Sequence, residues 1–415
     1  MILIFLQSEL WRMTKRRRIA LLIESSRAYG RDLLRGIATY ARAHGHWTFF
    51  HQERAVRDPA PARLADWRAD GIIARIETTK HIEQIRRLGV PVVDVFGLHR
   101  LDGIPSVEVD QEAVVRLAIE HLRERNLPHF AFCGYPGLFF SDARSRWFVR
   151  LLAEAGHDVH VYQTTRQRPN AGLSLVEMRS LRRTGHLAAW VKSLPKPTGL
   201  MACNDMRALQ VLEACAEQGI AVPDEVAVIG VDNDAVQCEL CDPPLSSVDP
   251  AARQVGYEAA ALLDRMLSRR KPVKNPILIK PSVVVSRQST AVLAVSDPYV
   301  ADAVRFMHAR CCELIRTADV ARHAGVSRST LERRFMRAVG RSPSAELARM
   351  RLERVRELLQ HTDLSLRAIA DRVGFDHVES MCRLFKKHAG QTPGAFRRHA
   401  PPPDDSLGFA PCTPR

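Results

Sequence analysis

Short apolar runs alternate with amphipathic stretches from residue 17 to about residue 290. Runs without polar alternation are typical of parallel strands that are covered on both faces. The runs predicted as strands are Arg18–Ile23, Gly71–Ala74, Val90–Val95, Phe130–Cys133, Gly199–Ala202 and Val226–Val231. Helical spacing fills Asp32–Ala43, Glu112–Arg125, Ala143–Ala155, Asp205–Gln218 and Ala251–Leu267. This βα order predicts open parallel sheets with helices on both faces.

The length of the βα region, residues 17 to 290, favours two lobes over one. Ser106–Asp110 and Leu245–Asp249 are short extended pieces, and each enters a helix through an Asp suited to the N-cap or the first turn. We interpret them as chain crossings between the lobes. The Pro-interrupted stretch ILIKPSVVV at 277–285 is predicted as a final edge strand, and residues 291–297 as a linker.

Beyond residue 297 the pattern becomes entirely helical and contains an internal repeat. Residues 317–347 match residues 365–396. The paired positions are Val320-Ala321 with Ile369-Ala370, Gly325 with Gly374, Phe335 with Phe385, Gly340 with Gly390, and Pro343 with Pro393. The offset is 49 for the first two pairs and 50 afterwards, so one residue is inserted after the first glycine.

Each copy of the repeat has a short helix, a turn at the glycine and a second helix, which is the helix-turn-helix layout. Leu331 and Phe335, and likewise Met381 and Phe385, fall on one helical face and are predicted to be buried. The opposite face is predicted to enter a major groove, with Ser329, Glu332, Arg333 and Met336 in the first copy and Val378, Glu379, Cys382 and Arg383 in the second. Phosphate contacts are expected from Ser327, Arg328, Thr330, Arg334, Lys386 and Lys387.

The charge distribution supports this reading of the repeat. The chain of 415 residues carries a net charge of +15, and residues 301–400 hold 20 Lys and Arg against 11 Asp and Glu. A helical segment between the two copies would set their recognition helices roughly one DNA turn apart. We therefore expect residues 298–400 to bind double-stranded DNA at two successive major-groove segments.

The two ends of the chain and its cysteines suggest no further activity. Residues 1–16 form a basic leader whose charges follow its apolar start, and Met13 is the expected true start. Residues 401–415 are expected to be a disordered tail. The odd number of cysteines and the scattered histidines imply no disulfide framework, metal or cofactor. A cytoplasmic protein without a membrane segment is the expectation.

Residues 297–400 resemble the AraC-type DNA-binding domain. The resemblance rests on Arg351–Leu359 (RLERVRELL), Ile369-Ala370, Gly374-Phe375, Phe385-Lys386-Lys387, Gly390, Thr392-Pro393 and Phe396-Arg397. The chain departs from the family at Met381-Cys382, where an aromatic residue followed by Ser is usual. The resemblance implies a transcription regulator.

Residues 17 to about 290 resemble the periplasmic-binding-protein-like sensor domain of LacI and GalR regulators. The order of the domains, with the sensor first, is similar to that of the xylose operon regulators, whereas LacI relatives carry their DNA-binding domain at the N-terminus. The resemblance implies a homodimer that binds a small sugar, with xylose favoured. It also implies activation through contact with RNA polymerase.

A two-lobed sensor binds its ligand between the lobes, at the carboxyl ends of strands. Polyols need charge-assisted hydrogen bonds, so Asp, Arg and Asn there are the candidates. Asp232 in G-V-D-N and Arg144 in R-S-R-W-F are similar to family ligand residues, with Arg146 as the rival and Trp147 replacing a small residue. Asn204 and Asp110 match family positions that reach the cleft. Ser25, Ser26 and Tyr29 follow the first strand, where an aromatic ring would stack on a sugar.

Each candidate has a structural alternative. Asp110 and Asp205 are also suited to capping helices, Arg146 to a solvated surface and Tyr29 to packing. For the whole chain, the alternative is an enzyme of a doubly wound fold that acts on a sugar or nucleoside and carries a basic accessory domain. The sequence lacks a G-x-G-x-x-G after the first strand, a Walker loop and a G-x-S-x-G elbow, which disfavours it. An exported transport receptor would need a signal peptide and no DNA-binding tail.

Overall fold

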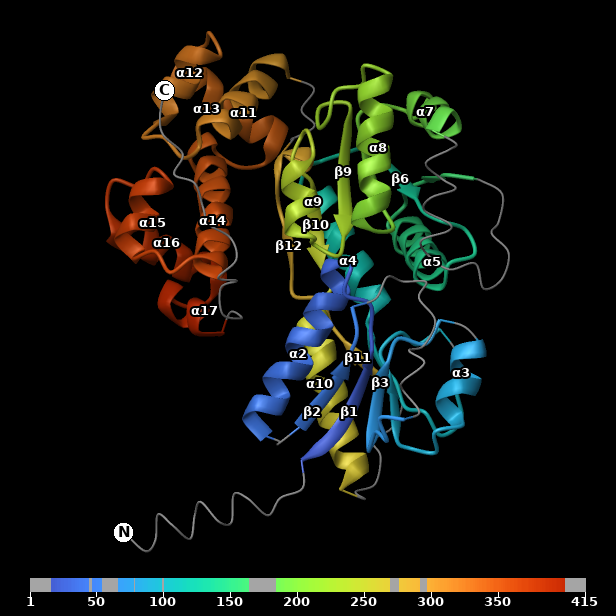
Figure 1. Ribbon diagram of the computed structural model, residues 1–415. Coiled ribbons are helices and arrows are strands. Elements are labelled where there is room, and N and C mark those ends of the chain that lie inside the picture. Colours follow the sequence, from blue (N-terminus) through green and yellow to red (C-terminus); the bar gives the residue numbers. More distant parts are fainter. Residues whose placement is uncertain are drawn as a thin grey trace, which may run out of the picture. The chain divides into compact units, whose positions relative to one another are not determined.

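The computed structural model describes residues 16–44, 47–53, 66–77, 79–98, 101–163, 184–268, 276–291 and 297–399. The chain divides into two compact units, Met1–Thr290 and Ala291–Arg415 (Figure 1). The predicted leader up to residue 15, the centre of the predicted linker and the predicted tail lie outside the described residues. Among the described helices, none is both long and apolar enough to span a membrane.

The first lobe of unit 1 is built on a parallel sheet with the strand order β2-β1-β3-β4. Its strands are β1 (Arg17–Leu22), β2 (Trp47–His51), β3 (Gly71–Ala74) and β4 (Val92–Asp94). Its helices are α2 (Ala28–His44), α3 (Thr79–Arg86) and α10 (Ala252–Leu267), and α3 lies on the other side of the sheet from α2 and α10 in Figure 1. In the inner strands, Ile19–Leu22 of β1 and all of β3 are apolar and buried, as is typical of parallel strands that are covered on both faces.

Helices α2 and α10 approach each other closely at two glycines. A Cβ on Gly36 would lie 1.9 Å from the carbonyl oxygen of Arg253, and one on Gly256 would lie 2.0 Å from that of Leu33. Only glycine permits this contact between the two backbones, which joins residues far apart in the sequence into one lobe.

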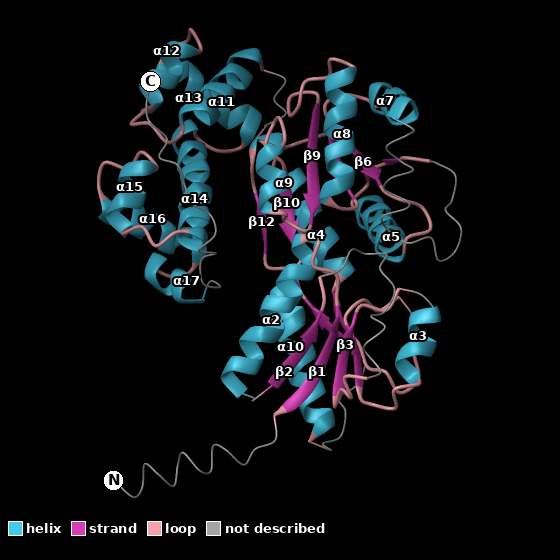
Figure 2. Ribbon diagram, viewed as in Figure 1, coloured by secondary structure: helices cyan, strands magenta, loops and turns pink. Residues whose placement is uncertain are grey.

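The second lobe has a six-stranded sheet with the order β12-β10-β9-β8-β6-β7. Four of its strands, β12, β10, β9 and β6, are labelled in Figure 2. Its strands are β6 (His129–Cys133), β7 (Val159–Val161), β8 (Thr198–Ala202), β9 (Val226–Val231), β10 (Ser246–Asp249) and β12 (Val283–Val285). Its helices are α4 (Gln111–Arg123), α5 (Phe139–Glu154), α7 (Thr184–Ser193), α8 (Asp205–Glu217), α9 (Ala235–Leu240) and the 3₁₀ helix η2 (Gln288–Thr290). All strand pairs are parallel except that of the edge strand β12, which runs antiparallel to its neighbour β10.

Apart from the edge strand predicted at 277–285, the predicted strands and helices of unit 1 are present, with ends shifted by at most four residues. The prediction of a single edge strand at 277–285 is wrong. It is interrupted at Pro281 into β11 (Ile277–Ile279), which pairs with β5 (Val107–Val109), and β12 in the second lobe. Proline has no N–H to donate and a fixed φ, so the ladder ends there and the chain passes to another sheet.

The two aspartates predicted at helix entrances behave differently. Asp110 is the N-cap of α4 and accepts a hydrogen bond of 3.0 Å from the Ala113 backbone N–H. Asp249 lies outside α10, whose N-cap is Ala251 at φ 59°, and accepts from the Ala251 N–H at 2.8 Å. Asp249 therefore supports the turn before the helix instead of capping it.

The described residues of unit 2 form helices and no strand, and the repeat is confirmed. Its helices are α11 (Pro298–Arg310), α12 (Thr317–His323), α13 (Arg328–Val339), α14 (Pro343–His361), α15 (Leu366–Arg372), α16 (Val378–Ala389) and α17 (Pro393–His399). The pair α12 and α13 repeats as α15 and α16, and the inserted residue falls in the turn before α16. Helix α14 serves two cores: Leu347 and Met350 belong to one, and Val355 and Leu358 to the other.

Candidate functional site

The candidate ligand pocket opens where strands of both lobes of unit 1 end. It has a volume of about 600 Å³, part of which is open to solvent. The first lobe contributes residues that follow β1, β3 and β4: Glu24, Arg27, Tyr29, Arg75, Val95 and Phe96. The second lobe contributes Phe139, Phe140 and Arg144 of α5, Asn204 after β8 and Asp232 after β9, and the crossing at β5 adds Val109 and Gln111.

The pocket brings together Asp232, Arg144, Asn204 and Tyr29 among the residues singled out from the sequence. Asp110 and Ser25 are not part of its lining: Asp110 caps α4, and the carbonyl oxygen of Ser25 accepts from Arg31 Nη1 at 3.1 Å. Between the two rival arginines, Arg144 lies in the pocket and Arg146 is exposed on α5.

Asp232 stands on a turn with an unusual backbone. Its φ is 116° and that of Asn233 is 48°, a region that side-chain-bearing residues rarely occupy. The turn is held from β10, because the Asp232 N–H donates to Val248 O at 3.1 Å and the Asn233 N–H to Ser247 Oγ at 3.0 Å. These bonds maintain a costly conformation that presents Asp232 to the pocket.

Arg144 is 3% exposed and has a fixed orientation. Its Nε donates to Gln111 Oε1 at 2.8 Å and its Nη1 to the backbone carbonyl of Cys203, and its guanidinium lies 5.3 Å from the centre of the Phe140 ring. The guanidinium thereby links α5, the start of α4 and the residue before Asn204.

Glu24 and Arg75 form a buried ion pair in the pocket that the sequence analysis missed. Arg75 Nη1 lies 2.8 Å from Glu24 Oε1, and its Nε lies 2.7 Å from Glu77 Oε1. The guanidinium is 4.3 Å from the centre of the Phe96 ring. Burial raises the pKa of Glu24 although the charge of Arg75 opposes it, and burial raises the pKa of the Tyr29 phenol. A charged residue near the end of a buried strand was the available signal.

Asp205 lies behind the turn of Asp232 and connects its surroundings. Its Oδ1 accepts from Ser247 Oγ at 2.6 Å and its Oδ2 from the Asp234 N–H at 2.9 Å. Burial and the charge of Asp232 raise the pKa of Asp205 to about 8, although these hydrogen bonds oppose the shift. Asn204, not Asp205, is the N-cap of α8, and accepts from the Arg207 N–H at 3.0 Å.

The chemistry of the lining suits a polyol better than a reaction. Carboxylate, guanidinium and amide groups converge on the pocket, and aromatic rings offer apolar faces. Among the described residues that line it, none is Ser, Cys or His, the usual partners in nucleophilic catalysis. The residues that the structure describes contain no group of three or more His, Cys, Asp or Glu arranged to hold a metal.

The recognition helices of unit 2 have the predicted cores. Leu331 and Phe335 on α13, and Met381 and Phe385 on α16, are all completely buried. Most residues of the opposite faces are exposed: Ser329, Arg333 and Met336 on α13, and Glu379, Arg383, Lys386 and Lys387 on α16. Thr330, Glu332, Val378 and Cys382 are partly exposed.

Three of the residues that were expected to contact phosphates already make contacts within unit 2. Ser327 Oγ accepts from the Thr330 N–H at 3.2 Å and so caps α13. Arg328 pairs with Glu332 at 2.9 Å along the helix. Arg334 differs from the expectation, because its Nη1 pairs with Asp297 Oδ2 at 2.7 Å; that contact anchors α13 to the start of α11.

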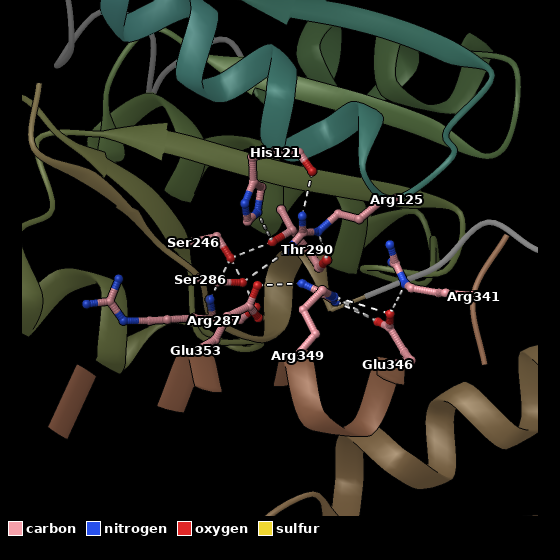
Figure 3. A network of polar contacts seen from close by, with 10 residues as sticks. All are labelled: His121, Arg125, Ser246, Ser286, Arg287, Thr290, Arg341, Glu346, Arg349 and Glu353. Carbon is pink, nitrogen blue, oxygen red and sulfur yellow. Dashed lines mark hydrogen bonds and ion pairs between the residues drawn. The ribbon is translucent and has the colours of Figure 1, made fainter. Parts of the chain in front are cut away.

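The start of α14, between the two recognition helices, contains a buried carboxylate (Figure 3). The side chain of Glu346 is fully buried, and its oxygens pair with Arg341 and, at 2.7 Å, with Arg349, which also pairs with Glu353. Although burial opposes ionisation, the two arginines keep the pKa of Glu346 below its usual value. Ser342 caps the same end, accepting from the Ala345 N–H at 3.2 Å.

Family models cover both units. A model described as the XylR N-terminal domain matches residues 18–108, one described as a periplasmic binding protein-like domain matches residues 119–290, and a helix-turn-helix domain matches residues 320–399.

Similar proteins cover nearly the whole chain. The xylose operon regulatory protein of Escherichia coli K12 is 35% identical over 92% of this chain and 97% of its own, and that of Haemophilus influenzae is 32% identical over 92% and 98%. The solved structure of the xylose-binding transcription activator XylR superposes with a TM-score of 0.60 at 32% identity, and covers 93% of this chain. A LacI regulator from Rhodococcus, with a TM-score of 0.53 at 19% identity, shares the fold of 67% of the chain.

Proposed function

The chain belongs to the family of xylose operon regulators, and on this premise we propose that its pocket binds D-xylose and that the occupied pocket controls DNA binding by unit 2. As a member of this family it is a sugar-sensing transcription regulator and not an enzyme. The observation that carries the proposal is the convergence of Asp232, Arg144 and the Glu24–Arg75 pair on one pocket between two lobes.

A pentose matches this pocket in its chemistry. Its hydroxyl groups pair with charged acceptors and donors on opposite walls: Asp232 and Arg144 in the second lobe, and Glu24 and Arg75 in the first. The rings of Tyr29 and Phe96 supply faces for the apolar side of the sugar. A ligand that bonds to both lobes favours the arrangement in which the lobes are closed over the one in which they are open. The size of this effect is set by the difference between the affinities of the ligand for the two arrangements.

The DNA contacts that we propose are on α13 and α16. In the first copy they come from Ser327, Arg328, Ser329, Thr330, Glu332 and Arg333, and in the second from Val378, Glu379, Cys382, Arg383, Lys386 and Lys387. Arginine side chains at Arg333 and Arg383 are suited to guanine O6 and N7. Helix α14, with 19 residues, is about 28 Å long, which separates the two motifs by nearly one turn of DNA.

We further propose that the chain is an activator that contacts RNA polymerase and works as a homodimer. Activation is supported by the description of its similar solved structure as a xylose-binding transcription activator. Contact with RNA polymerase and the homodimer are what the resemblance of the sequence implies. Sedimentation of the full chain with and without DNA tests the dimer.

A sugar screen on the full chain tests the proposed ligand. All five tryptophans lie within residues 1–290, so a change in tryptophan fluorescence reports on the sensor unit. D-xylose is expected to raise the melting temperature and to change the fluorescence with saturation, since binding to the native state stabilises it by mass action. L-arabinose, D-ribose and D-glucose serve as comparisons. A panel in which no sugar shifts either signal would contradict the proposal.

A further inference from the structure

The segment by which the chain leaves unit 1 is tied firmly to the second lobe. It comprises Ser286, Arg287 and η2, and the chain continues from Thr290 toward Asp297, the N-cap of α11. Ser289 Oγ donates to Val228 O at 2.6 Å and accepts from the Ser246 N–H at 2.8 Å. We call residues 286–290 the exit segment. It is the part of unit 1 from which the chain continues to unit 2.

One side chain connects the exit segment with the turn that carries Asp232. Arg287 Nη2 donates to Asn233 Oδ1 at 3.1 Å, and Nη1 donates to Leu245 O at 2.9 Å. Its own backbone N–H donates to Ser246 Oγ at 2.7 Å. Asn233 directly follows the pocket residue Asp232, and both have positive φ. A single hydrogen bond therefore connects the conformation of this turn with the position of the Arg287 side chain.

The other end of the exit segment is bonded to His121 of α4 and to Arg125, which lies just beyond the end of that helix (Figure 3). Thr290 O accepts from Arg125 Nε at 2.6 Å, and Thr290 Oγ1 lies 2.8 Å from His121 Nε2 and 2.7 Å from Ser246 Oγ. Helix α4 begins at Gln111, which lines the pocket and accepts from Arg144. Its 13 residues span about 20 Å. The exit segment thus has a second, more rigid link to the pocket.

We infer that Arg287 is a positioning residue that couples the occupancy of the pocket to the exit segment, and through it to DNA binding. This inference rests on the proposed function. A sugar that bonds to Asp232 changes the conformation of the turn formed by Asp232 and Asn233. The hydrogen bonds from His121 and Arg125 meanwhile keep Thr290 in place. Arg287 joins the moving turn to the held segment, so the contact with Asn233 differs between the two states of the pocket.

The contacts of Arg287 make it suitable for substitution. They are made to neutral oxygens, of Asn233 and Leu245, so removal of the guanidinium leaves no buried carboxylate without its partner. Arg287→Met keeps most of the apolar stem, and Asn233→Gly breaks the same bond from the other side. Glycine tolerates the φ of 48° at that position.

The test measures two affinities of the full chain: that for D-xylose, and that for the operator DNA with and without D-xylose. In the wild type the ratio of the two DNA affinities gives the coupling, which for allosteric proteins is commonly about 5- to 150-fold. Arg287→Met and Asn233→Gly are each expected to bind xylose within about threefold of the wild type and to bring the coupling close to 1.

A matched control and a double variant complete the design. Gln288 is exposed in the same segment, and Gln288→Ala is expected to keep the wild-type coupling. Asn233→Gly removes a hydrogen bond that Arg287→Met removes as well, so the double variant should lose no more coupling than Arg287→Met alone.

Three outcomes overturn the inference: both single variants keep the wild-type coupling, Gln288→Ala loses as much as they do, or the double variant loses clearly more. If Arg287→Met fails to fold, Asn233→Gly alone decides between these outcomes. Failure of the proposed function is a separate result, because the wild type itself would then not bind the sugar or would show no coupling.

Discussion

Asp232 combines a charge in the pocket with a backbone that few residues adopt. Asp232→Asn removes the charge but keeps the shape, and asparagine tolerates positive φ better than most residues. Hydrogen bonds to charged groups contribute about 1.5 to 3 kcal/mol and neutral ones about 0.5 to 1.5 kcal/mol, so the variant, which keeps a neutral bond, is expected to lose about 1 to 1.5 kcal/mol of xylose affinity. Titration followed by tryptophan fluorescence measures it. Asp224→Asn, an exposed aspartate before β9, is the control, and equal affinity of the two variants would refute the role of Asp232.

The raised pKa of Asp205, at about 8, predicts a pH dependence of stability. Between pH 4 and pH 8 the unfolded chain ionises this group while the folded chain keeps it protonated. The free energy of unfolding of unit 1 should therefore fall as the pH rises, by at most about 1.4 kcal/mol per pH unit.

Asp205→Asn should flatten this dependence. Asp94, whose pKa burial raises to about 6, contributes in the same direction at the lower end of the range, so a smaller dependence should remain below pH 6. Urea unfolding at pH 5 and pH 8, followed by tryptophan fluorescence, compares the variant with the wild type. An unchanged difference between the two pH values would show that Asp205 is ionised throughout.

Arg333 is an exposed arginine on the outer face of α13 and the first choice for a base contact. Arg333→Ala should weaken binding to the operator by about 1 to 3 kcal/mol and leave xylose binding unchanged. Arg305→Ala, on α11, removes an exposed arginine that pairs with Asp302 and should have a smaller effect. Competition against unrelated DNA distinguishes a base contact from a phosphate contact. If Arg333→Ala weakened specific and nonspecific binding equally, Arg333 would contact phosphates and not bases.

Single residues were predictable where local pattern and chemistry agree. Asp232 follows a long apolar strand, and the structure does place it in the pocket. Asp110 has the same signal and caps a helix, because the sequence does not show which side of a strand end faces the pocket. Glu24 and Arg75 are 51 residues apart, and only the adjacency of β1 and β3 brings them together.

At the scale of elements, α14 is the part that fixes the two recognition helices, and Glu346 fixes its first turns. Glu346→Gln removes the charge that Arg341 and Arg349 share, so the start of α14 should be destabilised by about 1 to 3 kcal/mol. Hydrogen exchange of the full chain should show faster exchange of the α14 amides.

Glu357→Gln is the matched control for this prediction. Glu357 pairs with Arg354 later on the same helix, in a more exposed position, where an ion pair contributes less than about 1 kcal/mol. Equal acceleration in the two variants would mean that the burial of Glu346 adds nothing.

Apolar strands of unit 1 were predicted well, and edge elements were not. β2 has the sequence WTFFH with partly exposed residues on both faces, so neither continuous burial nor strict alternation marks it. β11 and β12 look like one strand in the sequence, and their assignment to different sheets depends on partners far away in the chain. The repeat in unit 2 was predictable because the same pattern of apolar residues and glycines occurs twice in the sequence.

For the whole molecule, the sequence determines the order of the two units but not how one affects the other. The charge of residues 301–400 and the repeat indicate DNA binding, and the βα pattern indicates a sensor. The hydrogen bonds of Arg287 and Thr290 depend on side chains of α4 and of the turn after β9, and no local pattern predicts them.

The affinity of the full chain for its operator, measured with and without D-xylose at one fixed salt concentration, tests the central claim most directly. Footprinting upstream of neighbouring genes supplies the DNA, and fluorescence anisotropy supplies the two affinities. Sensing by unit 1 predicts that saturating xylose tightens binding by about 5- to 150-fold, which corresponds to about 1 to 3 kcal/mol of coupling. Identical binding curves with and without xylose would contradict the account.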